Sequence, residues 1–340
     1  MSRVTVRDVA KAVGCHYTTV AAALRNSTKV AEATKQKILA KADELGYRRD
    51  PYLSALNSYK RNKENPAFRA TIGWIDNYPK RRGALYYPGF EEYFQGAFYR
   101  ARELGYGLEQ FWFGDPELRL ERGISILRAR NIQGVLLAPQ PNPDTHYDFE
   151  WDKFSVVTFG YSIVKPHLNL ISNHQFRLML TLQRKLATLG YKRIGLHLLR
   201  SHDARLDYQL SGAYFAEDVD RQTKDKVPPL FEKVHEFEPF KAWVENHRPE
   251  VIITNTDHLP SWLARMNMKV PEDIGLALVT VTKKEPFFAG MYQNGISIGQ
   301  SAVDLLDSMI RRGQVGIPEK PVHLLIDGEW QDGKSVRKIR

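Results

Sequence analysis

The chain has 340 residues, of which 43% are hydrophobic and 11% aromatic, so it is long enough for two or three folded domains with sizeable cores. Its net charge of +10 is concentrated in residues 1–63, which hold 13 Lys and Arg against 5 Asp and Glu, whereas the remaining residues hold 36 against 34. No apolar run approaches the roughly 18 residues that span a bilayer, no secretion signal is visible at the start, and the single cysteine, Cys15, excludes an intramolecular disulfide framework. We therefore expect a cytoplasmic protein without membrane segments, whose basic N-terminal module contacts a polyanion.

The first 46 residues have the pattern of three short helices. Apolar side chains recur in each at helical spacing, and these are Val6, Val9, Ala10 and Val13, then Val20, Ala23 and Leu24, then Ile38, Leu39, Ala42 and Leu45. Thr5 and Asp8 form a candidate capping box, and Gly14 and Gly46 are natural helix ends. A helix, a three-residue turn and a second helix in a basic module predict a DNA-binding helix-turn-helix, which we favour over a bundle that only packs against another domain.

Residues 47–68 have the composition of a connector. Asp50 offers a side-chain acceptor at a helix N-cap, and Pro51 follows at the first helical position, where no backbone N–H is needed. We therefore predict a short helix over about 51–61, followed by a polar linker through Pro66.

From Thr71 onward, predicted strands alternate with amphipathic helices. Strands are predicted at 71–76, 108–113, 134–138, 155–159, 193–198, 251–254 and 274–281. Helices are predicted near 90–104, 117–130, 174–189, 206–221, 258–266 and 297–312. This alternation indicates parallel sheets with right-handed crossovers, and its length favours two similar lobes over one sheet.

The tripeptide Leu-Gly-Tyr occurs at 45–47, 104–106 and 189–191. Each copy follows a predicted helix and precedes an extended segment. We interpret the three copies as helix C-caps rather than as an internal duplication.

The segment "VTVRDVAKAVGCHYTTVAAALRNSTKVAEATKQKILAKADELGY", residues 4–47, resembles the helix-turn-helix of the lactose-repressor (LacI) family of bacterial transcription regulators. The matching features are the T-x-x-D-V-A opening, the glycine turn, the Thr-Val pair, the asparagine that follows, and the closing E-L-G-Y. Further on, "TIGWI", "ILRARNIQGVLLAP", "KLATLGYKRIGLHL" and "VPEDIGLALV" resemble that family's effector-binding core, which is similar to periplasmic sugar-binding proteins.

The resemblance implies an N-terminal all-α helix-turn-helix domain at 1–47, a hinge helix and linker at 48–68, and a two-lobed α/β core with parallel sheets at 69–340. The first lobe is expected at about 69–160 and 290–325, and the second at about 161–289. The resemblance also implies a homodimer that binds a near-palindromic DNA operator, most simply as a repressor, and that responds to a small ligand between the lobes.

DNA contacts carried over from the family fall on the second helix and its surroundings. The chain departs from the family where Ala21 and Ala22 replace a serine and an arginine, so a long donor for guanine is missing. Leu56 stands where the family places a minor-groove wedge, a role that we favour over ordinary helix packing. The expected phosphate contacts are Thr5, Thr19, Arg25, Asn26 and Lys29, with His16 as a phosphate or base contact and with Tyr17, Thr18 and Ala22 at base edges.

The effector site is expected at the carboxyl ends of the strands. The predicted contacts are Asp76, Asn77 and Tyr78 in the first lobe, and Tyr161, Gln209, Asn255, Asp257 and Thr280 in the second. Gln209 and Thr280 stand where the family has an arginine and an aspartate, and the loss of both charges argues against a simple-sugar inducer. A carbohydrate remains one candidate, beside a different small ligand or none that controls DNA binding.

Other classes of function have weaker support. "GISIG", residues 295–299, fits the G-x-S-x-G motif of serine hydrolases, but only His323 follows as a candidate base. No phosphate-binding glycine loop, H-E-x-x-H motif or Cys/His cluster is present, so no cofactor, catalytic residue or metal ligand is predicted. A sugar-binding protein without a regulatory role is the remaining alternative, against which the basic N-terminal module and the missing export signal argue.

Overall fold

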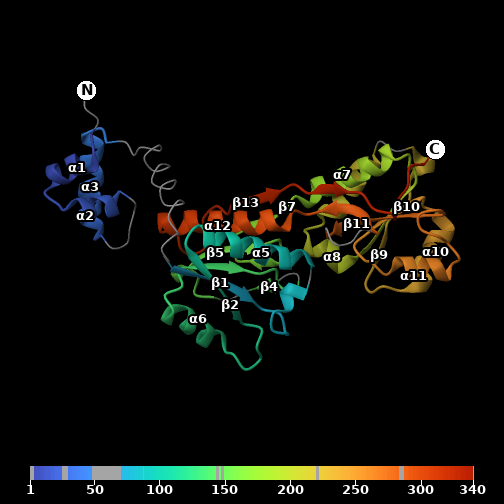
Figure 1. Ribbon diagram of the computed structural model, residues 1–340, viewed down its shortest axis with the longest axis horizontal. Helices are drawn as coiled ribbons and strands as arrows, with labels where there is room; N and C mark the ends of the chain where they lie inside the picture. Colours follow the sequence, from blue (N-terminus) through green and yellow to red (C-terminus); the bar gives the residue numbers. More distant parts are fainter. Residues whose placement is uncertain are drawn as a thin grey trace.

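The computed structural model describes residues 4–24, 30–47, 70–86, 88–142, 145–146, 149–219, 222–282 and 287–339. The N-terminal module contains α1 (Val6–Val13), α2 (Tyr17–Ala23) and α3 (Glu32–Glu44) (Figure 1). Their apolar stripes meet in a small core of Val9, Ala10, Val20, Ala23, Ile38 and Ala42. The helices therefore pack as the spacing predicted, except at Leu39. This side chain was expected in the buried stripe of the third helix but keeps 37% of its surface exposed, because it lies about 100° around the helix from the buried Ile38.

The ends of α1 follow from local chemistry. The Thr5 side chain accepts a hydrogen bond from the Asp8 backbone N–H at 3.3 Å, and the Asp8 carboxylate accepts one from the Thr5 N–H at 2.7 Å, which completes the predicted capping box. Gly14 ends the helix with a φ of 72°, a conformation that glycine adopts without steric cost. The short turn to α2 begins there.

The first lobe is built on a six-stranded sheet in which every described pairing is parallel. The strand order is β13-β7-β5-β3-β1-β2. In chain order the strands are β1 (Ala70–Asp76), β2 (Tyr106–Trp112), β3 (Gly134–Leu137), β5 (Ser155–Phe159), β7 (Asn169–Asn173) and β13 (His323–Ile326). A separate two-stranded pair joins β4 (Thr145–His146) to β6 (Ile163–Lys165).

Helices cover both faces of the first sheet. Helices α5 (Pro88–Glu103) and α12 (Gly295–Arg312) bury one face with Trp74 at its centre, and α6 (Leu120–Ala129) buries the other. Two glycines allow α5 and α12 to approach closely. A Cβ at Gly96 would lie 2.0 Å from the Ile296 carbonyl oxygen, and one at Gly299 would lie 2.0 Å from the Tyr93 carbonyl oxygen. Short 3₁₀ turns lie at Gly83–Tyr86 and Trp151–Lys153.

The second lobe repeats this architecture. Its strand order is β14-β12-β11-β10-β8-β9, with only β14 antiparallel to its neighbour among the described pairings. In chain order the strands are β8 (Ile194–Leu199), β9 (Leu230–Glu232), β10 (Val251–Thr254), β11 (Gly275–Val281), β12 (Ala289–Tyr292) and β14 (Glu329–Gln331). The helices are α7 (Gln175–Thr188), α8 (Arg200–Arg205), α9 (Gln209–Asp218), α10 (Phe237–His247) and α11 (Leu259–Arg265), with a 3₁₀ turn at Thr223–Asp225.

The chain crosses between the lobes at three places, and the predicted lobe boundaries shift accordingly. The first crossing lies between β7 and α7. Strand β7 pairs with β5, so residues 163–173 belong to the first lobe, whereas 161 was the predicted start of the second. The chain crosses back between β12 and α12, and again between β13 and β14. The second lobe therefore also contains residues beyond 328. Among the described residues, no helix is both long and apolar enough to cross a membrane.

Candidate functional site

The start of α2 presents the predicted DNA contacts on an exposed surface. The side chains of His16, Tyr17 and Thr18 are exposed, and Tyr17 keeps 50% of its surface accessible. His16 Nδ1 lies 2.8 Å from the Thr18 hydroxyl oxygen, and the ring centroids of His16 and Tyr17 are 4.7 Å apart. The three side chains thus form one contiguous polar and aromatic surface at the N-terminal end of α2.

The remaining predicted DNA contacts divide into two groups. Thr19 and Ala22 are half-buried on α2, while Thr5 is exposed and its hydroxyl donates to the Asp8 carboxylate at 2.7 Å. Arg25, Asn26, Lys29 and Leu56 lie outside the described residues, as does the predicted helix at 51–61. Their roles therefore stay predictions.

A cavity of about 460 Å³ lies between the two lobes. Its walls are formed where β5 and β7 end in the first lobe, where β10 and β11 end in the second, and by α5 and α8. This is the position that open parallel sheets provide for ligands, because loops at the carboxyl ends of strands are free to carry side chains for binding.

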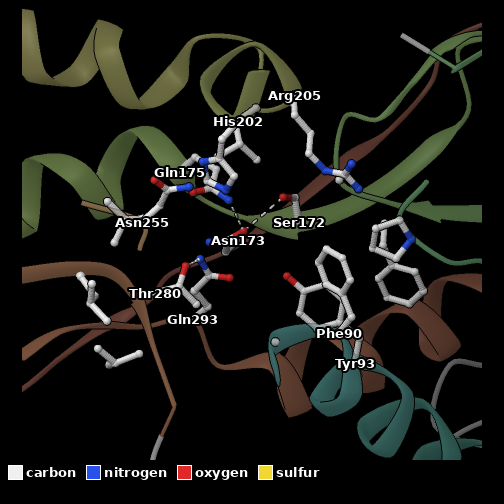
Figure 2. Close-up of a pocket in the computed structure, with 18 of the residues that line it drawn as sticks. Phe90, Tyr93, Ser172, Asn173, Gln175, His202, Arg205, Asn255, Thr280 and Gln293 are labelled. Carbon is white, nitrogen blue, oxygen red and sulfur yellow. Dashed lines mark hydrogen bonds between the residues drawn. The ribbon is translucent and has the colours of Figure 1, made fainter. Parts of the chain in front are cut away.

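The cavity wall contains polar atoms that have no protein partner. Among the described residues, Asn173 Nδ2, Asn255 Oδ1 and His202 Nδ1 are buried without a hydrogen bond. Asn173 is held in place through its other amide atom, because its Oδ1 accepts hydrogen bonds from Gln175 Nε2 at 2.6 Å and from the Ser172 hydroxyl at 3.3 Å (Figure 2). Buried unpaired polar atoms cost free energy, so three such atoms in side chains of one cavity wall favour a polar ligand.

Aromatic rings of the first lobe form a portion of the wall. Tyr93 stacks on Phe159 with centroids 5.4 Å apart and an interplanar angle of 20°, and Phe90 lies 5.6 Å from Tyr93. Figure 2 shows the rings of Phe90 and Tyr93 rising from α5 toward the cavity. Flat apolar rings beside amide groups fit a ligand that has both an apolar face and hydroxyl groups.

Arg205 connects the two lobes across the cavity. It is the last residue of α8 in the second lobe, and its guanidinium donates to the backbone carbonyls of Pro141, at 3.1 Å, and of Gln140 in the first lobe. Since both acceptors belong to the other lobe, these hydrogen bonds exist only when the lobes are in this arrangement.

Two titratable groups in the wall have shifted pKa values. Burial lowers the pKa of His202 to about 4, with a further contribution from the positive charge of Arg205. Burial raises the pKa of the Tyr161 phenol above its usual range, against a hydrogen bond from Gln209 that lowers it. His202 and Tyr161 are therefore neutral at pH 7 and can act as hydrogen-bonding groups.

The predicted effector residues fall into three positions. Tyr161, Asn255, Asp257 and Thr280 line the cavity, and the Thr280 hydroxyl accepts a hydrogen bond from Gln293 Nε2. Gln209 does not line it but contacts Tyr161. Three further predicted residues do not line it either, namely Asp76, Asn77 and Tyr78.

These three residues stabilise the loop after β1. The Asp76 carboxylate accepts hydrogen bonds from the backbone N–H groups of Tyr78, at 2.9 Å, and Ala84, at 3.4 Å. Asn77 donates to Gln140 Oε1 at 2.6 Å. Asp76, Asn77 and Tyr78 do lie at the carboxyl end of β1, as predicted. The segment around Gln140 separates this strand end from the cavity.

Several cavity residues were not predicted from the sequence. Phe90, Tyr93, Asn173, Gln175, His202, Arg205 and Gln293 all line the wall. Asn173 is the last residue of β7, a strand that was not predicted from the sequence, and Gln175 is the first residue of α7. A signal was present, because the polar segment Ser-Asn-His-Gln at 172–175 directly follows the short apolar run at 170–171.

The hydrolase motif has a packing role in this fold. Ser297 lies in the first turn of α12 rather than at a strand-to-helix corner, and a Cβ at Gly295 would lie 2.6 Å from the Glu92 Cβ. Gly295 and Gly299 therefore serve the contact between α12 and α5. The nucleophile elbow that the hydrolase alternative requires is not formed.

Comparisons with known proteins agree with this geometry. Residues 5–50 match the family model described as "Bacterial regulatory proteins, lacI family". The fold is similar to a solved "transcriptional regulator CelR-cellobiose complex", with a TM-score of 0.57, 16% identity, and coverage of 98% of this chain and 100% of that one. It is also similar to a lac repressor dimer bound to operator and the anti-inducer ONPF, with a TM-score of 0.55, 18% identity and coverage of 98% and 99%.

A third similar structure is a CCPA regulator of the LacI family from Weissella paramesenteroides with bound glucose. Its TM-score is 0.56 at 14% identity, over 79% of this chain and 99% of that one. No sequence among the curated proteins matches this chain. The family match confirms the resemblance predicted for the N-terminal domain, and the structural matches confirm the predicted two-lobed fold.

Proposed function

We propose that this chain, whose residues 5–50 are a LacI-family DNA-binding domain, is a transcriptional regulator, and that it represses by binding a near-palindromic operator as a homodimer. The observation that carries the proposal is the occurrence, in one chain, of an exposed α2 surface and a cavity between two lobes. It is a regulator rather than an enzyme. Because its target is bacterial DNA, we place it in the cytoplasm.

Sequence reading is assigned to the surface at the start of α2. Tyr17 and Thr18 are exposed there, and Thr18 can contact a thymine methyl or accept a hydrogen bond from a base edge. Ala22 can add only an apolar contact. Since few long donors are available, DNA shape contributes a large share of the specificity, and the proposed minor-groove wedge at Leu56 belongs to this part of the recognition.

The cavity is proposed to bind an uncharged ligand that carries several hydroxyl groups, such as a carbohydrate. Asn173 Nδ2 offers a donor and Asn255 Oδ1 an acceptor, and the neighbouring rings of Phe90 and Tyr93 offer an apolar face. Two of the similar solved structures contain bound cellobiose and glucose, which makes these sugars suitable first probes.

Homodimer formation is supported by exposed aromatic side chains. Phe98 and Tyr99 on α5 keep 41% and 57% of their surface accessible, and Phe215 on α9 keeps 49%. Large exposed aromatics are typical of protein–protein contacts. Two copies of a small DNA-binding domain also provide the two half-site contacts that a palindromic operator requires.

The test is selection of binding sites from a random DNA pool by the purified full-length chain, with and without cellobiose or glucose. We expect an enriched near-palindromic motif, and we expect ligand to change the amount of bound DNA in the parent protein but not in Asn173→Ala. Failure to enrich any motif, with DNA retained equally by Tyr17→Ala, would contradict sequence-specific binding and favour a sugar-binding protein without a regulatory role.

The two parts of the proposal can fail separately. If a motif is enriched but neither sugar changes retention, thermal-shift measurements with a broader set of polyols and charged metabolites test the cavity by itself. Stabilisation by charged metabolites alone would overturn the proposed ligand class and leave the DNA-binding role intact.

A further inference from the structure

A buried cluster of imidazole and carboxylate groups lies in the second lobe, outside the cavity wall. His197 is near the end of β8, Glu232 is the last residue of β9, and His235 lies in the loop before α10. His197 Nε2 is 2.7 Å from Glu232 Oε2, and His235 Nδ1 is 3.6 Å from the same oxygen. One candidate ligand atom from each residue can be chosen so that all three lie within 4.8 Å of one another.

Burial of these polar groups costs free energy unless each of their atoms has a hydrogen-bonding or metal partner. The His197 side chain is fully buried and that of Glu232 is 5% exposed. Within the described part of the chain, Glu232 Oε1, His235 Nδ1 and His258 Nε2 are buried without a hydrogen bond. A single His–Glu hydrogen bond is a common structural pair, but it would explain only the contact between His197 and Glu232. Glu232 Oε1 has lone pairs to offer, and so do His235 Nδ1 and His258 Nε2 in the tautomers that carry the proton on the other ring nitrogen, which is what a cation requires.

We propose that His197, Glu232 and His235 bind a divalent first-row transition metal ion, with Zn²⁺ as the preferred ion. Two imidazoles and one carboxylate form a donor set that Zn²⁺ uses, with a fourth position left for another ligand. Bonds of about 2.0–2.2 Å in tetrahedral geometry separate ligand atoms by about 3.3–3.6 Å. The contact between His197 and Glu232 would lengthen by about 0.6–0.9 Å, and that between His235 and Glu232 would change by about 0.3 Å or less.

The groups around the cluster favour this assignment. The Thr254 hydroxyl lies 3.3 Å from His197 Nδ1 and can orient the ring so that Nε2 faces the metal. His258 is hydrogen-bonded through Nδ1 to the Thr256 hydroxyl, and its ring lies 4.6 Å from that of His235. Its Nε2 is unpartnered but is not among the candidate ligand atoms that lie within 4.8 Å of one another, so it could supply the fourth ligand only after its side chain moves toward the cluster.

The site shares one loop with the cavity. Asn255, Thr256 and Asp257 line the cavity, whereas the next residue, His258, faces the cluster. The three proposed ligands do not line the cavity. Metal binding would hold this loop from the side opposite the ligand, so the site is distinct from the proposed effector site and does not depend on it.

The test uses Co²⁺ as a spectroscopic probe in the full-length chain after removal of metals with a chelator. We expect one Co²⁺ per chain with a Kd of about 1 µM or lower, visible absorption bands typical of tetrahedral coordination, and displacement by Zn²⁺. Glu232→Gln keeps the shape of the side chain, and His235→Ala removes a ligand at the edge of the cluster. Each should weaken Co²⁺ binding about 100-fold or more.

His167→Ala, which removes an exposed histidine of the first lobe, is the matched control and should bind Co²⁺ like the parent protein. Circular dichroism establishes that each variant is folded. The proposal is overturned if the parent chain binds no Co²⁺ at 100 µM, or if His235→Ala and Glu232→Gln bind it as tightly as the parent. Equal loss in His167→Ala would also overturn it, because the binding would then be nonspecific.

Discussion

Arg205 offers the sharpest test of how the two lobes are held together. Replacement by methionine keeps most of the side-chain volume and removes both hydrogen bonds to the first lobe, those to the carbonyls of Pro141 and Gln140. A hydrogen bond from a charged donor contributes about 1.5–3 kcal/mol, and the lower end applies to a half-buried guanidinium. The total of about 3 kcal/mol corresponds to a change of about 100-fold in the equilibrium between the bridged arrangement and one with separated lobes.

The separation of the lobes can be measured by energy transfer between two dyes. The chain has a single cysteine, so Cys15→Ser gives a background for Arg122→Cys on α6 and Asn246→Cys on α10, both exposed. In this background, Arg205→Met should shift the distribution toward lower transfer efficiency. Arg200→Met is the control, because Arg200 lies on the same helix but stacks on Phe231 in its own lobe.

The transfer efficiencies of the two variants distinguish a bridge between the lobes from a general effect on α8. If Arg205→Met leaves the distribution of transfer efficiencies unchanged, the two carbonyl contacts do not hold the lobes together. If Arg200→Met causes the same shift, the effect comes from destabilisation of α8 and not from loss of the bridge. Either result would refute the reasoning.

Three further predictions address DNA reading, packing and pH dependence. Thr18→Ala should relax the preference at one base position in each half-site, measured by site selection, and an unchanged motif would remove Thr18 from the base contacts. Gly299→Ala should lower the free energy of unfolding by about 2–3 kcal/mol in urea denaturation, because its Cβ would lie 2.0 Å from a carbonyl oxygen of α5. Gly89→Ala, whose Cβ would meet only a side-chain oxygen at 4.0 Å, should cost less than half as much, and equal costs would contradict the packing argument. Because the pKa of His202 is lowered to about 4, the unfolded chain binds more protons between pH 4 and about 6.5, so stability falls as the pH drops through this window, by at most about 3 kcal/mol. Urea denaturation of His202→Gln should show a shallower pH dependence than the parent, and parallel curves would refute the contribution of His202.

Features that depend on neighbouring residues in the chain could be predicted from the sequence. The capping box of Thr5 and Asp8 forms as expected, and the glycines of the three Leu-Gly-Tyr segments have φ values of 71°, 81° and 101°. The longer strands followed from runs of β-branched and apolar residues. These signals are local, because the side-chain period and the backbone requirement are both contained in a few residues.

Short elements were missed because tertiary pairing creates them. Strands β7, β9, β12, β13 and β14 have three to five residues each, and β13 pairs with β7 although more than 150 residues separate them. Helix α10 begins within "FEPF", where a proline in the first turn hid the helical pattern. Missing β7 also concealed Asn173, and with it an important polar group of the cavity.

The proposed metal ligands also come together only through tertiary structure, so the sequence contains no metal motif. His197, Glu232 and His235 come from a strand, the end of another strand and a loop, and 35 residues separate the first two. Sequence motifs such as H-E-x-x-H report ligands that share one helix. Ligands that meet only when parallel strands align at their carboxyl ends have no fixed spacing to detect.

Gln209 and Arg205 have different partners beside the cavity. The resemblance implies an arginine at position 209, but Gln209 contacts the Tyr161 phenol instead. Arg205 lies one turn earlier in the sequence, and Asp207 and Tyr208, with φ values of 54° and 56°, interrupt the helix between them. This interruption lets the guanidinium point from the end of α8 toward the first lobe rather than along α9.

The position of Arg205 has a consequence for the ligand. Two backbone carbonyls of the first lobe already accept hydrogen bonds from the guanidinium, and it is the only Arg or Lys among the described residues that line the cavity. The unpaired polar atoms that remain, Asn173 Nδ2, Asn255 Oδ1 and His202 Nδ1, belong to neutral groups. A phosphorylated or carboxylated ligand would therefore compete with the lobe bridge for the same cation, whereas a neutral polyol could bind while the bridge stays formed. The geometry favours the neutral ligand for this reason.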